Sequence, residues 1–533
     1  MTALQRRLGR TKARGFRAPS RRLPSTIIHI CGLALLAVAP GLALSALIEW
    51  YHDDSATVAL LACTVIFAIV GALMFRSTKI DDLTPRTIFG AVAWSWMLIS
   101  ILGALPFVLA RTFQRDGVGR WIEMADAIFE SVSGYTCTGS TVLTTLPDFA
   151  DPDPQVGRGI LFYRQLTQWY GGMGFVQLVI TVLPTLGTRA LGFMGAEAPG
   201  PTAERLSPRA RDTARLLWIV YAGVTGLIAV AYRLAGMPFF DAIAHAVTTS
   251  ATGGFSIYND SIGEYDSIPI ELVAQVGMLI GGANFTLHWL FVSRDRGIYR
   301  KDPEFRSYIA IAVVATAIVT SMLVVNDSVG GFGSALRAAS FNVVSMATST
   351  GFGNAQGAGT PGDFVRWSAS PLVIILLLMA VGGMSGSTAG GMKVVRIRVL
   401  AAASQRLVDT VRQRRAVIPV KINNEVVKED VVHRIGVFVI AYIVMTVGGL
   451  IVVVALGGEL EASIGATIGS LSNMGPGLAD AGPTSTFLVF PTPARMVLAF
   501  LMLAGRLELF AVLLMLAAPR RVLRQLQPHK KAF

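Results

Sequence analysis

Charged residues are scarce in this chain of 533 residues. They make up 15% of the sequence, against 53% hydrophobic residues, and the mean hydropathy is +0.57. A soluble protein carries about 25% charged residues, so the shortage argues against an ordinary soluble domain and is typical of helices that face lipid. Apolar stretches near the roughly 20 residues needed to cross hydrocarbon recur along the whole length. The sequence therefore predicts a multi-pass membrane protein.

Cysteine and histidine are also few. The three cysteines, Cys31, Cys63 and Cys137, lie in apolar segments or in a polar turn beside one, which leaves no disulfide framework and no metal-ligand spacing. The six histidines are scattered and form no metal-ligand pair. We expect no organic cofactor in this chain.

Acidic residues are outnumbered by basic ones, 33 to 46, which gives a net charge of +13. Nucleic-acid binding is one interpretation of such a balance, but the positions argue against it. The basic residues gather in an arm at 1–24, in connections between apolar segments and in a tail at 520–533. Basic connections beside spanning helices mark the cytoplasmic side. This predicts that both termini are cytoplasmic, and that the arm contacts anionic membrane lipid rather than nucleic acid.

Ten stretches are predicted to span the membrane: 25–48, 57–76, 86–110, 159–185, 214–236, 269–293, 307–326, 370–396, 433–457 and 492–518. Shorter apolar pieces, such as Trp121 to Ser133, lie between the later pairs. The order is two leading helices and then a unit of helix, half-helix, turn and helix that occurs four times. We predict an all-α polytopic membrane protein with four helix–pore-helix–filter–helix repeats in pseudo-fourfold arrangement. The predicted parts are an arm at 1–24, leading helices at 25–85, repeats at 86–190, 191–300, 301–415 and 416–519, and a tail at 520–533.

Four short polar turns, each with a glycine, follow the apolar half-helices. Irregular backbone within a membrane is tolerated only where it is buried in protein or lines a water-filled cavity. Carbonyl oxygens of four converging turns are able to replace the water shell of a cation, and the partly negative C-terminal ends of the half-helices favour positive charge. The predicted ion-binding residues are Thr136, Cys137, Thr138 and Gly139; Ala251, Thr252, Gly253 and Gly254; Thr348, Ser349, Thr350 and Gly351; and Ser472, Asn473, Met474 and Gly475.

A glycine-rich run from Gly382 to Lys393 interrupts the eighth predicted span, so we expect a broken helix there. Arg506 is alone in an apolar run, where an arginine costs roughly 2.5 kcal/mol or more at a helix centre, and it should face the interior. Glu508 is two positions away and on a helix does not face it. We expect Arg506 to bind carbonyls and hydroxyls of the broken segment and to gate the path. The predicted gate residues are Arg506, Gly382, Gly383, Ser385, Gly386, Ser387, Thr388, Gly390 and Gly391.

Other polar residues have plainer interpretations. Arg164 is expected at the membrane interface. Glu130 and His245 occupy one aligned position in the first two half-helices and are expected to be packing contacts. Asp126 and Asp241 are expected to cap or anchor those half-helices.

Two other classes of protein remain open. Ser385 lies in a G-M-S-G sequence that suits an intramembrane serine protease, which needs a histidine base within reach. His245 and His288 are candidates only as isolated residues, and this hypothesis leaves the four turns without a purpose. A solute symporter is the other class, but no substrate-sized group of polar residues is visible at mid-membrane.

The motifs together are similar to those of the Trk/Ktr/HKT superfamily of potassium transport proteins. The resemblance rests on T-C-T-G-S-T, A-T-G-G-F-S, T-S-T-G-F-G and S-N-M-G-P-G at the four turns, on G-S-T-A-G-G-M-K and on G-R-L-E. It covers nearly the whole chain, and the two leading helices favour the TrkH branch. Cys137 departs from the second threonine that is common there.

The resemblance implies uptake of potassium across the bacterial inner membrane through one filter. It places the family's gate loop at about Gly382 to Gly391 and its gate arginine at Arg506. It also implies a homodimer controlled by a cytoplasmic nucleotide-binding ring of the TrkA or KtrA type. A serine in place of Gly139 would favour sodium, so the glycine favours potassium. A sodium-permeable or ion-coupled symporter of the same fold stays open as an alternative.

Overall fold

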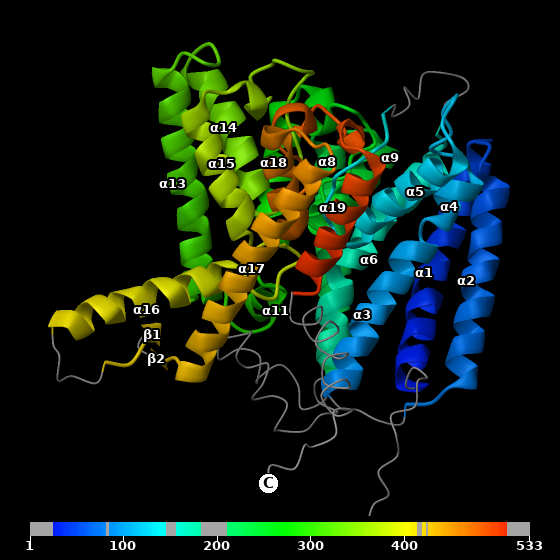
Figure 1. Ribbon diagram of the computed structural model, residues 1–533, viewed down its shortest axis with the longest axis horizontal. Coiled ribbons are helices and arrows are strands. Elements are labelled where there is room, and N and C mark those ends of the chain that lie inside the picture. Colours follow the sequence, from blue (N-terminus) through cyan, green and yellow to red (C-terminus); the bar gives the residue numbers. More distant parts are fainter. Residues whose placement is uncertain are drawn as a thin grey trace, which may run out of the picture.

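The protein is described by a computed structural model that covers residues 25–80, 85–144, 156–182, 210–412, 418–422 and 425–508. The predicted arm, the tail and the part of the last predicted span beyond 508 lie outside these residues. Figure 1 shows a bundle of helices with α1 (Ser25–Tyr51) and α2 (Thr57–Ser77) at one edge and α13 (Pro303–Val325) towards the other. From the bundle α16 (Val394–Arg412) projects sideways, together with a small hairpin of β1 (Lys421–Ile422) and β2 (Glu425–Val426).

The remaining elements are almost all helical. The α-helices are α3 (Pro85–Leu102), α4 (Leu105–Leu109), α5 (Arg120–Tyr135), α6 (Arg158–Val182), α8 (Ala210–Leu234), α9 (Phe239–Ser250), α10 (Ile268–Gly281), α11 (Phe285–Ser293), α12 (Ile298–Lys301), α14 (Phe332–Ala347), α15 (Ala369–Val381), α17 (Glu429–Ala455), α18 (Leu460–Ser472) and α19 (Thr492–Arg506). Short 3-10 helices are η3 (Ser261–Tyr265), η4 (Phe364–Arg366), η5 (Ala479–Ala481) and η6 (Phe487–Val489).

Several of these helices are suited to lipid. Among the described residues, six helices are long and apolar enough to cross a membrane, or seven if α10 and α11 count as one bent span. Large apolar side chains such as Ile440, Val444 and Ile451 stand exposed on α17, and exposed apolar faces of this size mark a membrane or partner surface. The predicted spans outside this set are shorter, with 13 residues in α15 and 15 in α19, or contain polar residues, as α6 does. A multi-pass membrane protein is confirmed.

The four predicted half-helices are α5, α9, α14 and α18; the first three end directly before a polar turn, and α18 ends at Ser472, the first residue of the fourth turn. Each packs against the long helix that precedes it in the chain, in the pairs α3–α5, α8–α9, α13–α14 and α17–α18. Each also packs against the helix that follows it, in the pairs α5–α6, α9–α10, α14–α15 and α18–α19. The same neighbours thus recur in all four units, while their pseudo-fourfold arrangement stays a prediction.

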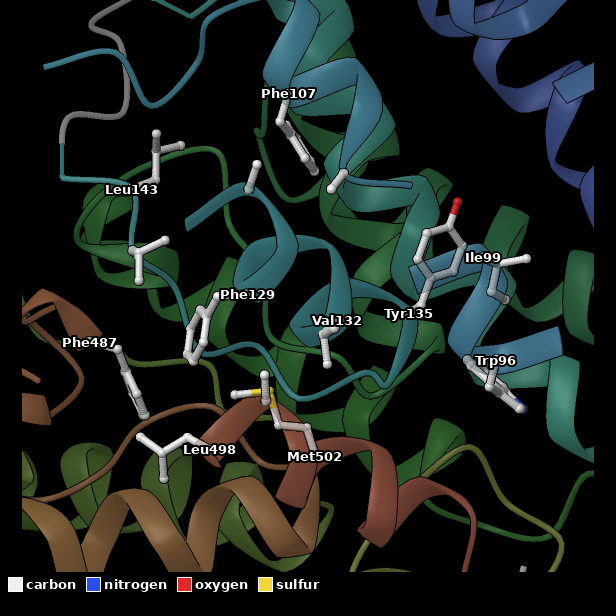
Figure 2. Close-up of a cluster of buried hydrophobic side chains, with 14 of the residues drawn as sticks. Trp96, Ile99, Phe107, Phe129, Val132, Tyr135, Leu143, Phe487, Leu498 and Met502 are labelled. Atoms are coloured by element: carbon white, nitrogen blue, oxygen red, sulfur yellow. The ribbon is translucent and has the colours of Figure 1, made fainter. Parts of the chain in front are cut away.

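Apolar side chains hold the first half-helix in place. Figure 2 shows Phe129 and Val132 of α5 close to Leu498 and Met502 of α19, and Phe487 beside them. All five side chains are buried, and they belong to one continuous core. Burial of a large apolar side chain contributes roughly 1.5–3 kcal/mol, so this contact fixes the first turn relative to the last helix.

Two predicted spans are interrupted. The break expected near Gly382 is present, because α15 ends at Val381 and α16 begins at Val394. The prediction of one continuous span over 269–293 was wrong, because α10 and α11 meet at an angle of 95°. Asn284 begins the second piece, with its side-chain oxygen accepting a hydrogen bond from the amide of Thr286 at 2.8 Å. The paired glycines at the end of α10 weaken the helix at this point.

Candidate functional site

The four polar turns share an irregular backbone. Their second residues all have a positive φ, 54° at Cys137, 49° at Thr252, 53° at Ser349 and 53° at Asn473. Such angles are uncommon outside glycine. The fourth residue is a glycine in every turn, and φ is 88° at Gly139, 80° at Gly254 and 85° at Gly351. Gly475 does not have a positive φ, so the fourth turn departs from the other three.

The turns contact one another in cyclic order. A Cβ atom placed on each glycine would clash with the next turn: from Gly139 it would lie 2.4 Å from the carbonyl oxygen of Gly253, from Gly254 2.1 Å from that of Thr350, from Gly351 2.9 Å from the amide nitrogen of Gly475, and from Gly475 2.8 Å from the carbonyl carbon of Gly139. Heavy atoms do not approach a real Cβ this closely. The structure therefore brings the four predicted turns together into one ring that excludes side chains at the glycines.

Hydroxyl and amide groups tie the turns together. The hydroxyls of Thr136 and Thr138 lie 2.7 Å apart, and Thr348 and Thr350 repeat this contact at the same distance. Between turns, the amide nitrogen of the Asn473 side chain donates to the hydroxyl of Thr138 at 3.2 Å. These groups are buried, so the bonds fix the backbone of the ring.

A cavity of about 290 Å³ lies beside the ring. Its lining includes all four glycines, together with Thr141, Ser256 and other small polar residues from the segments after the turns. No group of three or more His, Cys, Asp or Glu side chains in the described part of the chain is placed to hold a metal ion. The glycines and hydroxyl-bearing residues at the ring present backbone carbonyl and hydroxyl oxygens to this cavity.

Arg506 lies inside the protein, 7% exposed, at the end of α19. Its guanidinium donates to the carbonyl oxygen of Thr388 at 2.8 Å and to that of Gly171 at 2.7 Å, with a longer bond of 3.2 Å to that of Gly172. The Cys137 sulfur is 3.6 Å away. A fixed positive charge thus connects the broken segment, the middle of α6 and the first turn.

The expected partners of Arg506 were found only in part. Thr388 is one of them, through its carbonyl group. No hydrogen bond joins Arg506 to Ser385 or Ser387: the amide of Ser385 donates to Glu304 at 2.8 Å, and the hydroxyl of Ser387 donates to the carbonyl of Met384 at 2.7 Å. The carbonyls of Gly171 and Gly172 were missed, although paired glycines at that point of α6 were a visible signal.

The rest of the broken segment lies close to Arg506. A small cavity of about 30 Å³ is lined by Ser387, Gly390, Gly391, Lys393 and Arg506, among others. Gly382, Gly386 and Gly391 have positive φ angles of 70°, 73° and 76°, which a helix does not allow. Backbone of this kind at membrane depth is tolerated only in contact with protein or a cavity.

Arg164, Glu130 and His245 are buried and make more hydrogen bonds than the sequence indicated. Arg164, expected at the interface, is 2% exposed and pairs with Glu130, its Nε donating to Oε1 at 2.7 Å. His245, expected as a packing contact, has its two ring nitrogens within 2.9 Å of the Asp241 carbonyl oxygen and of the Ser256 hydroxyl. The interface expectation for Arg164 was wrong, whereas His245 is a buried packing contact as expected and is also hydrogen-bonded. Charged and polar groups buried in a protein are satisfied by partners that sequence spacing does not reveal.

The arrangement does not suit a serine protease. The ring nitrogens of His288 contact the Tyr299 hydroxyl at 2.6 Å and the Ile280 carbonyl oxygen at 3.0 Å. His245 is likewise occupied by Asp241 and Ser256. Neither histidine is therefore available as the base that Ser385 would need.

Comparisons with known proteins agree with this geometry. The TrkH family model, described as a cation transport protein, matches residues 56–521. The chain is 32% identical to the Trk system potassium uptake protein TrkH of Salmonella typhimurium and 34% identical to that of Vibrio parahaemolyticus, over 92% of this chain and 97% and 98% of those proteins. The crystal structure of the potassium transporter TrkH from Vibrio parahaemolyticus matches with a TM-score of 0.80 and 33% identity, covering 92% of this chain and 98% of that one. This chain therefore belongs to the TrkH family of cation transport proteins, and its function is transport rather than catalysis.

Proposed function

We propose that this protein takes up potassium ions across the bacterial inner membrane, through the ring formed by its four turns. The observation on which this rests is the cyclic contact of Gly139, Gly254, Gly351 and Gly475. Four backbone segments of one chain meet there, and rings of backbone carbonyls replace the hydration shell of potassium in selective channels. The printed names of the relatives, potassium uptake proteins, support the same ion.

Arg506 and the segment from Gly382 to Gly391 form the proposed gate. The guanidinium lies next to the Cys137 sulfur and holds carbonyls of Thr388 and Gly171. A positive charge in this position repels a cation that leaves the ring, and repulsion is strong where water is excluded. Ions would pass only after Arg506 or the broken segment moves.

The proposed control comes from a cytoplasmic nucleotide-binding ring of the TrkA or KtrA type that acts on a homodimer of this chain. The projecting helix α16 supports this idea, since it stands away from the bundle where a partner can reach it (Figure 1). Its first turn follows the broken segment directly. The basic arm and tail would hold both termini at anionic lipid on the cytoplasmic side.

Ion flux into proteoliposomes tests the proposal. Purified protein is reconstituted, and uptake of potassium and of sodium is measured without and with an imposed proton or sodium gradient. We expect potassium uptake that exceeds sodium uptake and that runs down the potassium gradient alone. Equal sodium uptake, or uptake only with a second ion gradient, would instead favour the sodium-permeable or ion-coupled symporter. Absence of any cation uptake would refute the function.

A further inference from the structure

One sequence position recurs in the half-helix that precedes each turn. It lies nine residues before the glycine and is occupied by Glu130, His245, Asn342 and Ala466 in the four half-helices. The three polar side chains at this position, here called the support residues, are fully buried. Buried polar groups are costly unless they are hydrogen-bonded. Their partners therefore indicate what these residues hold in place.

In the first repeat the support residue binds the segment directly after its own turn. The Thr141 hydroxyl donates to Oε1 of Glu130 at 2.8 Å, and the amide of Val142 donates to Oε2 at 2.9 Å. Thr141 is two residues beyond Gly139. The carboxylate of Glu130 thus links α5 to the residues that directly follow the first turn, Thr141 and Val142.

Arg164 extends this contact to the second repeat. Besides its bond to Glu130, its Nη1 donates to the carbonyl oxygen of Ser256 at 2.7 Å. Its guanidinium also lies over the Phe255 ring, 3.5 Å from the ring centre, an arrangement that attracts a cation. Phe255 and Ser256 directly follow Gly254. The ion pair of Glu130 and Arg164 therefore holds the segments that directly follow two neighbouring turns.

The second and third repeats use neutral groups in the same way. His245 contacts the hydroxyl of Ser256, the residue aligned with Thr141, at 2.9 Å. Asn342 donates to the side-chain oxygen of Asn354 at 3.1 Å, three residues after Gly351. In the fourth repeat Ala466 has no such group, and backbone packing replaces it: a Cβ on Gly477 would be 3.1 Å from the Ala466 amide nitrogen.

We propose that the support residues and Arg164 determine how strictly the ring discriminates potassium from sodium, as positioning residues that do not touch the ion. This inference rests on the proposed function. Sodium is smaller than potassium. If the segments after the turns are mobile, the ring can contract around a sodium ion; if the support residues hold those segments in place, it cannot. The ion pair is the strongest of these contacts, because hydrogen bonds between charged groups are stronger than those between neutral groups.

The test is a double substitution, Glu130→Leu with Arg164→Met. Removing both charges together avoids the destabilisation caused by a single unpaired buried charge. We expect the ratio of potassium to sodium flux in proteoliposomes to fall roughly tenfold, the equivalent of about 1.4 kcal/mol. Arg164→Lys keeps the charge but loses the planar fork that reaches both Glu130 and Ser256, and it should give an intermediate ratio.

The same half-helix offers a matched control. Asp126 lies one turn before Glu130, is equally buried, and pairs with Arg495 and Arg115. None of these contacts involves a segment after a turn. Asp126→Leu with Arg495→Met should therefore lower thermal stability in detergent while the flux ratio stays within about twofold, well below one tenfold step.

A second variant covers the case in which the first does not fold. His245→Leu removes a neutral support residue and leaves no charge unpaired, and it should also lower the flux ratio. A folded Glu130→Leu/Arg164→Met or His245→Leu protein with the wild-type ratio would overturn the inference. Failure of the proposed function is distinct, because wild-type protein would then show no preference for potassium at all.

Discussion

Glu508 lies two positions after Arg506, yet it binds Arg396, the third residue of α16, with 2.5 Å between Oε2 and Nη2. The guanidinium of Arg396 also lies over the Phe438 ring of α17, 4.0 Å from its centre. The end of α19, which contains Arg506, is thereby joined to the start of the projecting helix. A force on α16 would reach the proposed gate through this pair.

Replacing Arg396 by Gln should raise potassium flux. The change releases α16 from Glu508, and it also leaves that carboxylate to offset the positive charge of Arg506. Loss of a charge-assisted hydrogen bond of about 1.5–3 kcal/mol corresponds to a shift of roughly tenfold or more towards the open state. Flux in proteoliposomes without any regulatory partner measures it. Arg412→Gln, at the exposed far end of the same helix, is the control and should behave as wild type.

Arg506→Ala should give a leaky protein. The substitution removes the positive charge and its bonds to the carbonyls of Thr388, Gly171 and Gly172, so both the repulsion and the connection between segments are lost. We expect potassium uptake without regulatory partner to increase by roughly tenfold or more, as for any loss above 1.4 kcal/mol. Arg233→Ala, on the exposed end of α8, should leave uptake unchanged. Wild-type flux in the Arg506 variant would contradict the gate assignment.

Gly139→Ser should weaken discrimination against sodium. The new Cβ would lie 2.4 Å from the Gly253 carbonyl oxygen, and φ at this residue is 88°, so the ring must widen or distort. Competition of sodium with rubidium uptake measures the effect. Gly223→Ser provides the matched control, because a Cβ there meets no atom within 4 Å. Intact selectivity in the Gly139 variant would remove this residue from the ring's function.

Glu49→Gln should destabilise the protein without altering selectivity. The buried carboxylate at the end of α1 accepts hydrogen bonds from the amides of Ala56, Gly159 and Ile160, at 3.0, 2.5 and 3.1 Å. Negative charge at the N-terminus of α6 is favourable, and a neutral amide supplies fewer acceptors. We expect a loss of about 1.5–3 kcal/mol, visible as a lower thermal unfolding temperature in detergent. The exposed Glu461→Gln variant should unfold at the wild-type temperature.

The sequence was most informative where the membrane restricts which backbone structures are possible. Polar, glycine-containing turns between apolar segments are costly in a membrane unless they meet one another, so the four turns were predictable from spacing alone. The first half-helix was expected at 121–133 and extends from Arg120 to Tyr135. The break near Gly382 was predictable for the same reason, since five glycines in one apolar run do not sustain a helix.

Contacts between distant segments were not predictable. Arg506 finds its partners on α6, about which a lone arginine in an apolar run says nothing beyond the need for burial. Glu130 and Arg164 were both visible as polar residues, but their pairing depends on how α5 packs against α6. The bend between α10 and α11 was missed because apolar residues continue on both sides of Gly281 and Gly282, which preserves the appearance of a single span.

The ordinary backbone of Gly475 distinguishes one wall of the ring from the other three. A tetramer of identical subunits changes all four walls whenever one codon changes. In this chain each turn has its own residues, so one turn can change without the others. Gly475 in the fourth turn lacks the positive φ that restricts Gly139, Gly254 and Gly351. A substitution at Gly475 would therefore meet only the steric limit set by the Gly139 backbone, 2.8 Å from a new Cβ, whereas one at Gly139, Gly254 or Gly351 would meet a dihedral limit as well.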